Sequence, residues 1–393
     1  MYVKNASLLI LRSLLKPFRM KTKKLTFYFF ASACVLLIVV SCSKKEDLSY
    51  NTNSRTLDLS QNYSYDLGSD ELATLGRVLF YDNTLSVNNS VSCGSCHKQS
   101  RAFADTRASS RGFENVETSR NTPPIQNIGG FSLVNMGVMS KGGQALFWDG
   151  RERILQNMVM QPVFNHVEMG VKNTGDLVNR VKSRSYYPEL FSKAFDDEEI
   201  TFNRISEAIM WFVRNIQTNH SPFDQLFRNA IVNDQVLNSQ EQRGMNLFFG
   251  KYNCGSCHQL HSPTGYLPTG ETDNSELLNI GLDQVYTDKG LGGITGKPED
   301  DGKFKIPNLR NIALTAPYMH DGRFETLEEV LDHYNNGVQD NPNLDSRLRD
   351  ISGKPQVLNI STAEKEDIIA FLHTLTDGQM ITDPRLSDPF KKY

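Results

Sequence analysis

The chain of 393 residues lacks a surplus of basic residues, a second long hydrophobic run and any long stretch of alternating apolar residues. Its 42 Lys and Arg residues face 45 Asp and Glu residues, and seven of the basic residues fall in residues 1–41, where no acidic residue occurs. The other 35 basic residues therefore accompany all 45 acidic ones. Such a body has no positive charge to spare for phosphates, which excludes nucleic acid as a partner. The single apolar run also excludes a protein with several membrane spans.

That run, residues 27–40, follows the basic residues 21–24 and is followed by Ser-Cys42. Its length suits the hydrophobic region of a signal peptide better than a complete membrane span. A small residue before a cysteine, after aliphatic residues, resembles the lipobox of bacterial lipoproteins. The pattern predicts a signal peptide over residues 1–41, with Met20 as an alternative start, and a lipidated N-terminus at Cys42. An uncleaved anchor helix is the alternative.

Both interpretations place the body outside the cytoplasm. With Cys42 lipidated, the protein lies in the cell envelope, on the periplasmic side, anchored to a membrane. The residues that follow, up to position 62, are polar and poor in apolar side chains, so we expect a flexible tether there.

Cysteine is scarce, and its placement is informative. Apart from Cys34 in the leader and Cys42 at its end, the chain has only four cysteines. They form two copies of Cys-Gly-Ser-Cys-His, at residues 93–97 and 254–258. An exported protein ordinarily uses cysteines for disulfides, but Cys-x-x-Cys-His is the attachment signature of c-type haem. The two thiols add to the haem vinyl groups, and the adjacent histidine binds the iron.

A zinc site built from both cysteine pairs is the alternative. The pairs lie 158 positions apart, far beyond the spacing of zinc ribbons, and the same histidine follows each pair. The sequence therefore predicts two covalently bound haem c groups. The predicted haem-binding residues are Cys93, Cys96 and His97 for haem 1, and Cys254, Cys257 and His258 for haem 2.

Helical patterns repeat around the two motifs. Residues 71–81 and 241–249 are each typical of an amphipathic helix with one glycine, ahead of a short loop to the cysteines. Ser69 and Ser239 are the predicted N-caps of these helices. A second helical pattern repeats after each motif, over the ranges 205–218 and 368–375.

The glycines Gly76 and Gly244 lower the helix propensity of the first helix in each repeat. We therefore predict that the two helices of each repeat pack closely at these positions. The length suits about two domains. We expect an all-α chain of two tandem haem domains with extensive loops, over residues 63–235 for haem 1 and 236–393 for haem 2.

A third repeat bears on the chemistry. Phe147-Trp-Asp-Gly-Arg and Met319-His-Asp-Gly-Arg lie 50 and 61 positions after His97 and His258. Met319 is placed to supply the sixth ligand of haem 2, where a soft thioether favours Fe(II) and raises the potential. Phe147 stands at the matching position for haem 1 and cannot bind iron. The pattern predicts one closed haem and one open haem, unless Met319 is an ordinary core methionine.

Together these residues resemble the bacterial dihaem cytochrome c peroxidase family. The matching stretches are 120–123, 147–151, 167–170, 221–224, 307–311 and 315–322. The resemblance implies two cytochrome-c-like domains that face each other, with a calcium ion between the haems. It also implies reduction of hydrogen peroxide to water with electrons from a small donor such as a cytochrome c, which enter at haem 2. Members of the family often form homodimers.

Three residues gain a role from this resemblance. Glu168 matches the acidic residue of the peroxide pocket, which would move a proton between the peroxide oxygens; a solvated surface carboxylate is the alternative. Trp148 matches the tryptophan between the haems, a conduit for electrons or an ordinary buried aromatic residue. Asn121 matches a calcium-binding asparagine, although an asparagine in a turn is commonplace.

The chain also departs from the family. Many members close the peroxidatic haem with a histidine that precedes Asn121, and no histidine occurs from Lys98 to that residue. We therefore expect haem 1 to be five-coordinate or water-bound when fully oxidised, with His166 as the one candidate substitute ligand. Met158 lies near the place of the family's pocket glutamine.

Two other functions remain open at this point. Dihaem proteins that mature methylamine dehydrogenase resemble this chain and oxidise another protein, but they carry tyrosine where Met319 stands. A dihaem electron carrier would need both haems closed, which Phe147 opposes.

Overall fold

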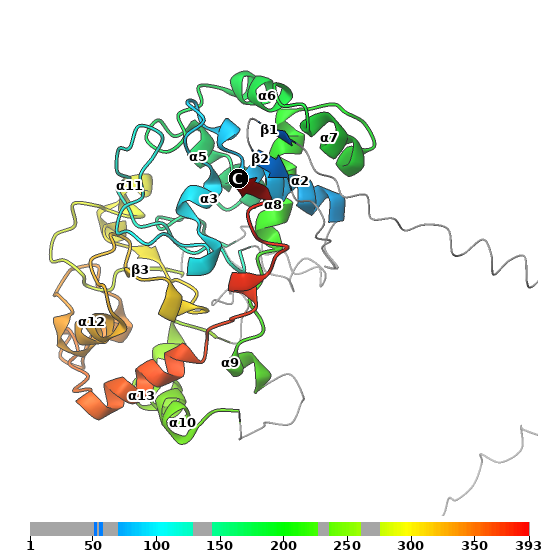
Figure 1. Cartoon of the computed structure of the whole chain (residues 1–393). Coiled ribbons are helices and arrows are strands. Elements are labelled where there is room, and N and C mark those ends of the chain that lie inside the picture. The colour runs from blue at the N-terminus through cyan, green and yellow to red at the C-terminus, as the bar shows by residue number, and fades with distance from the viewer. Residues whose placement is uncertain are drawn as a thin grey trace, which may run out of the picture. The chain divides into compact units, whose positions relative to one another are not determined.

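The computed structural model describes residues 51–52, 55–57, 70–128, 144–226, 236–260 and 276–392. All of them belong to one unit, residues 47–393, and they are the residues drawn in colour in Figure 1. The predicted signal peptide, Cys42 and most of the tether lie outside the described residues. Among the described helices, none has the length and apolar character that a bilayer span requires.

In the first half, helix α2 (Asp70–Tyr81) packs against helix α8 (Phe202–Arg214), and Figure 1 shows the two crossing. Their contact is closest at Gly76, where an added Cβ atom would lie 2.0 Å from the carbonyl oxygen of Ala208. No side chain fits there, so the packing requires glycine. The buried core on both sides of the contact includes Leu75, Leu79, Val78, Ile205, Ile209 and Phe212.

The second half repeats this arrangement with helix α10 (Ser239–Asn246) and helix α13 (Thr362–His373), which lie together in Figure 1. A Cβ atom on Gly244 would lie 1.9 Å from the carbonyl oxygen of Asp367. The predicted reason for both glycines, close packing of paired helices, is therefore confirmed.

The predicted cap of α10 is wrong by one residue. Asn238 is the N-cap, and its side chain accepts the backbone N–H groups of Gln240 and Glu241 at 2.9 and 3.0 Å. The Glu241 carboxylate accepts the N–H of Asn238 in return, so three backbone donors at the start of the helix are satisfied. Asn caps as well as Ser does, and only the backbone path decides between neighbours. Ser69, the other predicted cap, lies outside the described residues.

The remaining elements are short and join these helix pairs. The other α-helices are α3 (Cys93–Cys96), α4 (Leu155–Met158), α5 (Gln161–Phe164), α6 (Thr174–Lys182), α7 (Tyr187–Phe195), α9 (Pro222–Gln225), α11 (Gly292–Thr295) and α12 (Leu327–Asp332). Single turns of 3₁₀-helix are η1 (Asn83–Leu85), η2 (Gln99–Arg101), η4 (Cys254–Ser256), η5 (Pro298–Asp300), η6 (Ile312–Leu314), η8 (Ser346–Leu348) and η9 (Met380–Thr382). Single π-turns are η3 (Leu247–Lys251) and η7 (His333–Gly337).

Two small antiparallel sheets complete the fold. One has the strand order β1 (Asn51–Thr52), β2 (Arg55–Leu57) and β5 (Phe390–Lys392), and the other pairs β3 (Leu277–Leu278) with β4 (Phe304–Lys305). The described part of the chain is thus rich in helices and loops and has few strands, in agreement with the prediction, but the all-α prediction missed these strands. Strands of two or three residues are too short to show an alternating pattern.

The C-terminal residues return to the first half. Met380, Leu386 and Phe390 are buried in its apolar core. The Tyr81 hydroxyl donates to the carbonyl of Leu386 at 2.7 Å, and Arg77, only 1% exposed, donates to the carbonyl of Pro384 at 2.9 Å. The end of the chain therefore straps the first half, although it follows the second haem motif.

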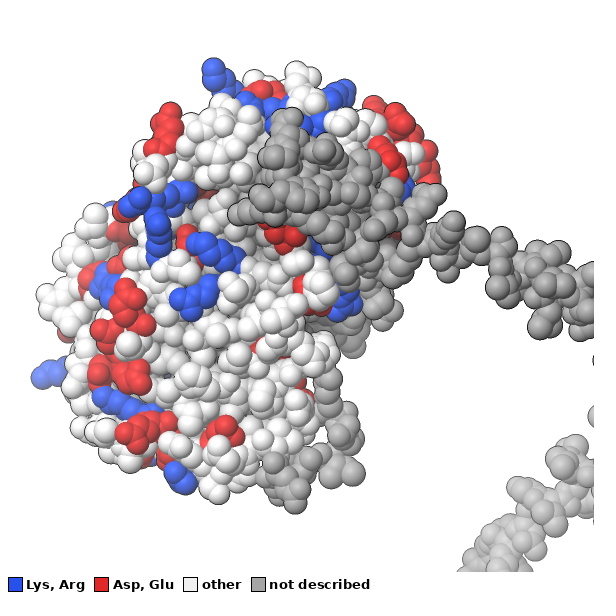
Figure 2. Space-filling model, viewed as in Figure 1, with Lys and Arg blue, Asp and Glu red and all other residues white. Residues whose placement is uncertain are grey.

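Charge on the surface is mixed. On the face that Figure 2 shows, Lys and Arg side chains lie among Asp and Glu side chains, and the described residues there form no continuous basic stripe.

Candidate haem sites and the junction between them

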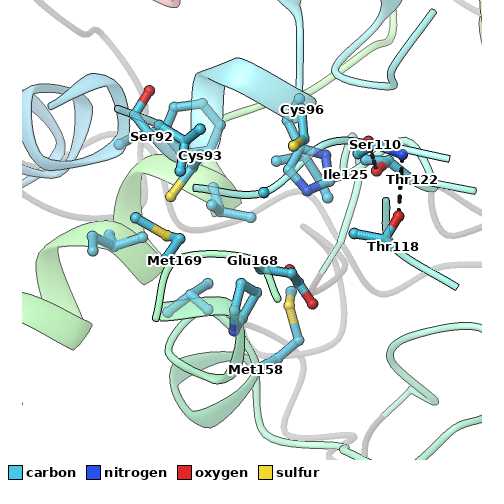
Figure 3. Close-up of a pocket in the computed structure, with 18 of the residues that line it drawn as sticks. Ser92, Cys93, Cys96, Ser110, Thr118, Thr122, Ile125, Met158, Glu168 and Met169 are labelled. Atoms are coloured by element: carbon cyan, nitrogen blue, oxygen red, sulfur yellow. Dashed lines mark hydrogen bonds between the residues drawn. The ribbon is translucent and has the colours of Figure 1, made fainter. Parts of the chain in front are cut away.

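A pocket of about 730 Å³, part of it open to solvent, lies beside the first Cys-x-x-Cys-His motif. Cys93, Cys96 and His97 line it, together with Glu168 and Met158. Figure 3 shows the two cysteines on helix α3 at one side of the pocket and Glu168 and Met158 across from them. The structure thus brings the predicted attachment site and the predicted peroxide-pocket carboxyl to the lining of one pocket.

The imidazole of His97 is held in a fixed orientation. Its Nδ1 lies 2.8 Å from the carbonyl oxygen of Phe103, so a hydrogen on Nδ1 is donated there and Nε2 keeps its lone pair. Ala102 and Phe103 both have positive φ, which closes the loop tightly enough to bring this carbonyl back. Burial lowers the pKa of His97, which favours the neutral ring that a metal requires. These residues fit a covalently bound haem c.

The second motif repeats this geometry. Nδ1 of His258 lies 3.2 Å from the carbonyl oxygen of Pro307, and burial lowers the pKa of His258 to about 4. Burial raises the pKa of Cys254 to about 11, and also raises that of Cys257, so both are thiols before any attachment. A second haem c fits here as well. Burial raises the pKa of Tyr334, and the charges that Cys257 and Cys254 would carry raise it further, an interaction that no sequence pattern indicated.

Glu168 is positioned by its own loop and by Gly112. The Asn165 side chain donates to Glu168 Oε1 at 2.9 Å and accepts the N–H of Val167 at 2.8 Å. The N–H of Phe113 donates to the carbonyl of Glu168 at 3.0 Å, and a Cβ atom on Gly112 would lie 1.6 Å from the carbonyl oxygen of Val167. Sequence reasoning missed Asn165, because a lone asparagine in a loop carries no distinguishing signal.

Burial raises the pKa of Glu168, and the nearby charge of Arg151 opposes that shift. A carboxyl with a raised pKa exchanges protons closer to neutral pH than a solvated one does. The arrangement is therefore suited to moving a proton within the pocket.

Other predicted pocket residues are placed as follows. Met158 lines the pocket and is 8% exposed, whereas His166 is exposed and is absent from the described residues that line it. Met169 lines the pocket too and was not anticipated. One part of the wall that was not predicted carries the hydroxyl groups of Ser110, Thr118 and Thr122. The Ser110 and Thr122 hydroxyls share a hydrogen bond, and the Thr118 hydroxyl accepts the backbone N–H of Ser110, as Figure 3 shows.

Phe147 and Met319 occupy equivalent places in the backbone. Their φ angles are +60° and +76°, and the glycines that follow, Gly150 and Gly322, have φ of +68° and +67°. Each turn is closed by one antiparallel bridge, between Leu146 and Glu152 in the first and between Tyr318 and Phe324 in the second. The third sequence repeat is therefore also a structural repeat.

The side chains of the two turns have different surroundings. The guanidinium of Arg151 lies 3.6 Å from the centroid of the Phe147 ring and pairs with Asp149 at 2.9 Å. Met319 packs against a small apolar cluster, and Trp148 of the first half packs against the same cluster. Its buried members are Leu282, Tyr286 and Phe304.

Trp148 and Asn121 are bonded to each other, and two backbone hydrogen bonds tie them to the second half. Its indole N–H donates to the carbonyl of Asn121 at 2.9 Å, and its own carbonyl accepts the N–H of Lys305 at 2.8 Å. The N–H of Asn121 donates to the carbonyl of His320 at 2.8 Å, next to Met319. The structure thus brings Asn121, Trp148 and Met319 together. In the described part of the chain, no three His, Cys, Asp or Glu side chains converge on a metal-sized site.

Comparisons with known proteins agree with this arrangement. The family model of di-haem cytochrome c peroxidase matches residues 70–231. The methylamine utilization protein MauG of Methylorubrum extorquens is 32% identical over 320 residues, which cover 80% of this chain and 81% of that protein. The cytochrome c551 peroxidase of Nitrosomonas europaea is also 32% identical, over 315 residues that cover 79% of this chain and 81% of that protein.

Solved structures agree as well. The crystal structure of a MauG-like protein associated with microbial copper homeostasis is 36% identical, with a TM-score of 0.66 over 82% of this chain and 94% of that one. The diheme peroxidase BthA of Burkholderia thailandensis, at 23% identity and a TM-score of 0.60, shares the fold. With its paired helices, its two haem-attachment motifs and this similarity along most of its length, the chain belongs to the di-haem cytochrome c peroxidase family.

Proposed function

We propose that the chain is a dihaem cytochrome c peroxidase that reduces hydrogen peroxide to water with electrons from a small external donor protein. The overall reaction consumes one peroxide, two electrons and two protons and releases two water molecules. The observation that carries the proposal is the shared pocket of Glu168, Cys93, Cys96 and His97. The cytochrome c551 peroxidase relative supports it.

Bound haem c supplies an iron that binds peroxide and accepts electrons. Glu168 takes a proton from one peroxide oxygen and returns it to the other, so that water is the leaving group. Asn165 holds the carboxyl by its 2.9 Å bond, and burial keeps its pKa raised. His97, neutral and oriented by the carbonyl of Phe103, would hold haem 1 through its Nε2.

Met319 and His258 would hold haem 2, which would take up the electrons of the donor. A thioether ligand favours the reduced metal, so this haem serves as the electron reservoir. Trp148 supplies the conduit towards the first pocket, because it packs against the same cluster as Met319 while its chain neighbour is Phe147.

A second candidate function is oxidation of another protein. The MauG relatives support it, since one of them is as similar to this chain as the peroxidase of Nitrosomonas europaea. Met319, where such proteins carry tyrosine, supports the peroxidase. An electron carrier is the weakest candidate, because Phe147 offers no ligand.

We also infer that the protein is lipid-anchored through Cys42 and works in the periplasm, from the leader pattern alone. Asn121 remains our candidate calcium ligand. Its buried position at the junction of the halves supports this, since its backbone contacts both Trp148 and His320.

The test is peroxide turnover with a reduced cytochrome c, in the holoprotein and in Glu168→Gln. We expect wild-type turnover and a loss of about 10²- to 10⁴-fold in the variant, the usual contribution of a general acid–base group. Glu198→Gln, a change at an exposed glutamate, is the matched control and keeps full activity. A wild-type protein without turnover, or a Glu168→Gln protein that matches it, overturns the proposal.

A further inference from the structure

Arg120 lies where the two halves meet, and the chemistry proposed above makes no use of it. Its Nε and Nη2 donate to the two carboxylate oxygens of Asp288 at 2.6 and 2.7 Å. Its Nη1 donates to Asp149, the residue after Trp148, at 2.5 Å. One planar cation therefore joins a carboxylate of the first half to a carboxylate of the second.

The same guanidinium also faces the loop that carries the sulfur ligand. It lies 5.8 Å from the centroid of the Phe304 ring. That ring stacks on the imidazole of His320, with centroids 3.7 Å apart and planes 15° apart. His320 directly follows Met319. Arg120 thus fixes both the residue after Trp148 and the aromatic ring that packs on the Met319–His320 loop.

The Arg120–Asp149 pair is largely shielded from solvent. The Asp149 side chain is 4% exposed and that of Arg120 is 20% exposed. Loss of the arginine would leave Asp149 with Arg151 as its remaining described cationic partner, at 2.9 Å, and would leave Asp288 without its bidentate partner. Breaking such a pair leaves the buried Asp149 carboxylate less well compensated, which destabilises the arrangement around it.

We propose that Arg120 is a positioning residue that sets the rate of electron transfer between the two halves, because it fixes Trp148 relative to the Met319–His320 loop. The inference rests on the proposed function. It assigns no contact between Arg120 and peroxide or donor, so the first pocket should react with peroxide whether or not Arg120 is present.

The experiment uses the holoprotein with haem 2 reduced, mixed with hydrogen peroxide in a stopped-flow spectrometer. Two signals are followed, the peroxide-dependent change of haem 1 and the loss of reduced haem 2. In Arg120→Gln the first signal keeps its wild-type rate, and the second slows by roughly tenfold or more, the scale expected for a small misplacement. Arg120→Lys keeps the charge but loses the bidentate geometry. We expect its rate of loss of reduced haem 2 to lie between those of the wild-type protein and Arg120→Gln.

Arg243→Gln is the matched control. Arg243 makes the same bidentate pair, from Nε and Nη2 to Asp367 at 2.8 Å each, but it lies within the second half. We expect both signals to keep their wild-type rates. The sulfur-to-iron charge-transfer band of haem 2 is recorded for each variant, and its retention in Arg120→Gln shows that Met319 still binds.

The outcomes separate the two proposals. If the wild-type protein loses reduced haem 2 on mixing with peroxide, and Arg120→Gln loses it at the same rate, the role of Arg120 is overturned. The proposed function is then unaffected. A wild-type protein whose reduced haem 2 does not respond to peroxide overturns the proposed function and this inference with it. Loss of the charge-transfer band in Arg120→Gln overturns positioning in favour of general structural support. Should that variant fail to fold, Asp288→Asn removes one arm only and takes its place, with the same expectations.

Discussion

The first and second halves of the chain are assembled from the same parts in the same order. Each has a helix with an obligatory glycine, a Cys-x-x-Cys-His loop, an Asp-Gly-Arg turn and a closing helix. The turns share their left-handed start, at φ +60° for Phe147 and +76° for Met319. They differ in the side chain at that start, and only one of the two can bind iron. A duplicated backbone thus presents two different side chains at one position, and the proposed difference between the two haems depends on that substitution.

The halves also hold their proximal histidines differently. His97 bonds to a carbonyl six residues further along, inside its own tight loop, at 2.8 Å. His258 bonds to a carbonyl 49 residues away, at 3.2 Å. That distant segment is itself tied down by Arg310, which donates to the carbonyl of Leu260 and pairs with Asp224. The first ligand is oriented locally, whereas the second depends on tertiary packing.

Exchanging the turn residue should have the largest effect. Phe147→Met gives the first turn the sulfur of the second, and we expect haem 1 to become six-coordinate and low-spin, with complete loss of peroxide turnover. The electronic spectrum of the oxidised protein and a turnover assay measure the two effects. Phe147→Leu, which removes the ring without adding a ligand, should stay high-spin and active. A Phe147→Met protein that keeps a high-spin haem 1 would show that a methionine sulfur at position 147 does not reach the iron, and that the two turns are not equivalent.

The reverse exchange should have a smaller effect. Met319→Phe removes the proposed sixth ligand of haem 2. A thioether stabilises the reduced iron more than the oxidised iron, so we expect its removal to lower the reduction potential of haem 2. Turnover with the donor falls, while direct reaction of haem 1 with peroxide persists. Potentiometric titration of haem 2 gives the shift. An unchanged potential would mean that Met319 is a core methionine.

The rate of reaction with peroxide should depend on pH through Glu168, a carboxyl of the first half. Because the Glu168 carboxyl must be ionised to accept a proton, and burial raises its pKa above the ordinary 4.5, the rate of reaction with peroxide should fall as pH drops through that raised pKa. Arg151 opposes the shift, so Arg151→Gln should move the inflection to higher pH. Stopped-flow rates measured from acid to neutral pH provide the profile. An inflection that survives in Glu168→Gln would assign it to another group.

Sequence reasoning reached the residues whose chemistry demands a pattern. Cys-x-x-Cys-His is recognisable without structure, and so is a helix glycine that needs a reason, such as Gly76. Asn165 escaped it, because its importance lies in a 2.9 Å bond to Glu168 that no spacing foretells. The strap from Tyr81 to Leu386 escaped it as well, because these residues are 305 positions apart.

The predicted N-cap of α10 was wrong by one residue, for a physical reason. Ser239 and Asn238 are both good caps, and the choice between them follows from where the chain enters α10. The roles of Glu168, Trp148 and Asn121 came from family resemblance. What the structure adds is that Glu168 shares the pocket of His97, and that Trp148 and Asn121 share a hydrogen bond.

The smallest effect tests whether the halves are equivalent in packing. Alanine normally stabilises a helix over glycine by about 0.5–1 kcal/mol. At Gly76 and Gly244 the added Cβ atom would lie 2.0 and 1.9 Å from a backbone oxygen, so the paired helices must separate, at a cost of about 1–3 kcal/mol typical of overpacking. The cost exceeds the gain, and because the two distances match, both variants should lower the midpoint of thermal unfolding by similar amounts. Gly250, whose added Cβ atom would contact nothing within 4 Å, is the control, and Gly250→Ala should leave the midpoint unchanged or raised. A lower midpoint for Gly76→Ala without one for Gly244→Ala would show that the second half relaxes around the added Cβ atom. The two helix pairs would then differ in rigidity although their sequences repeat.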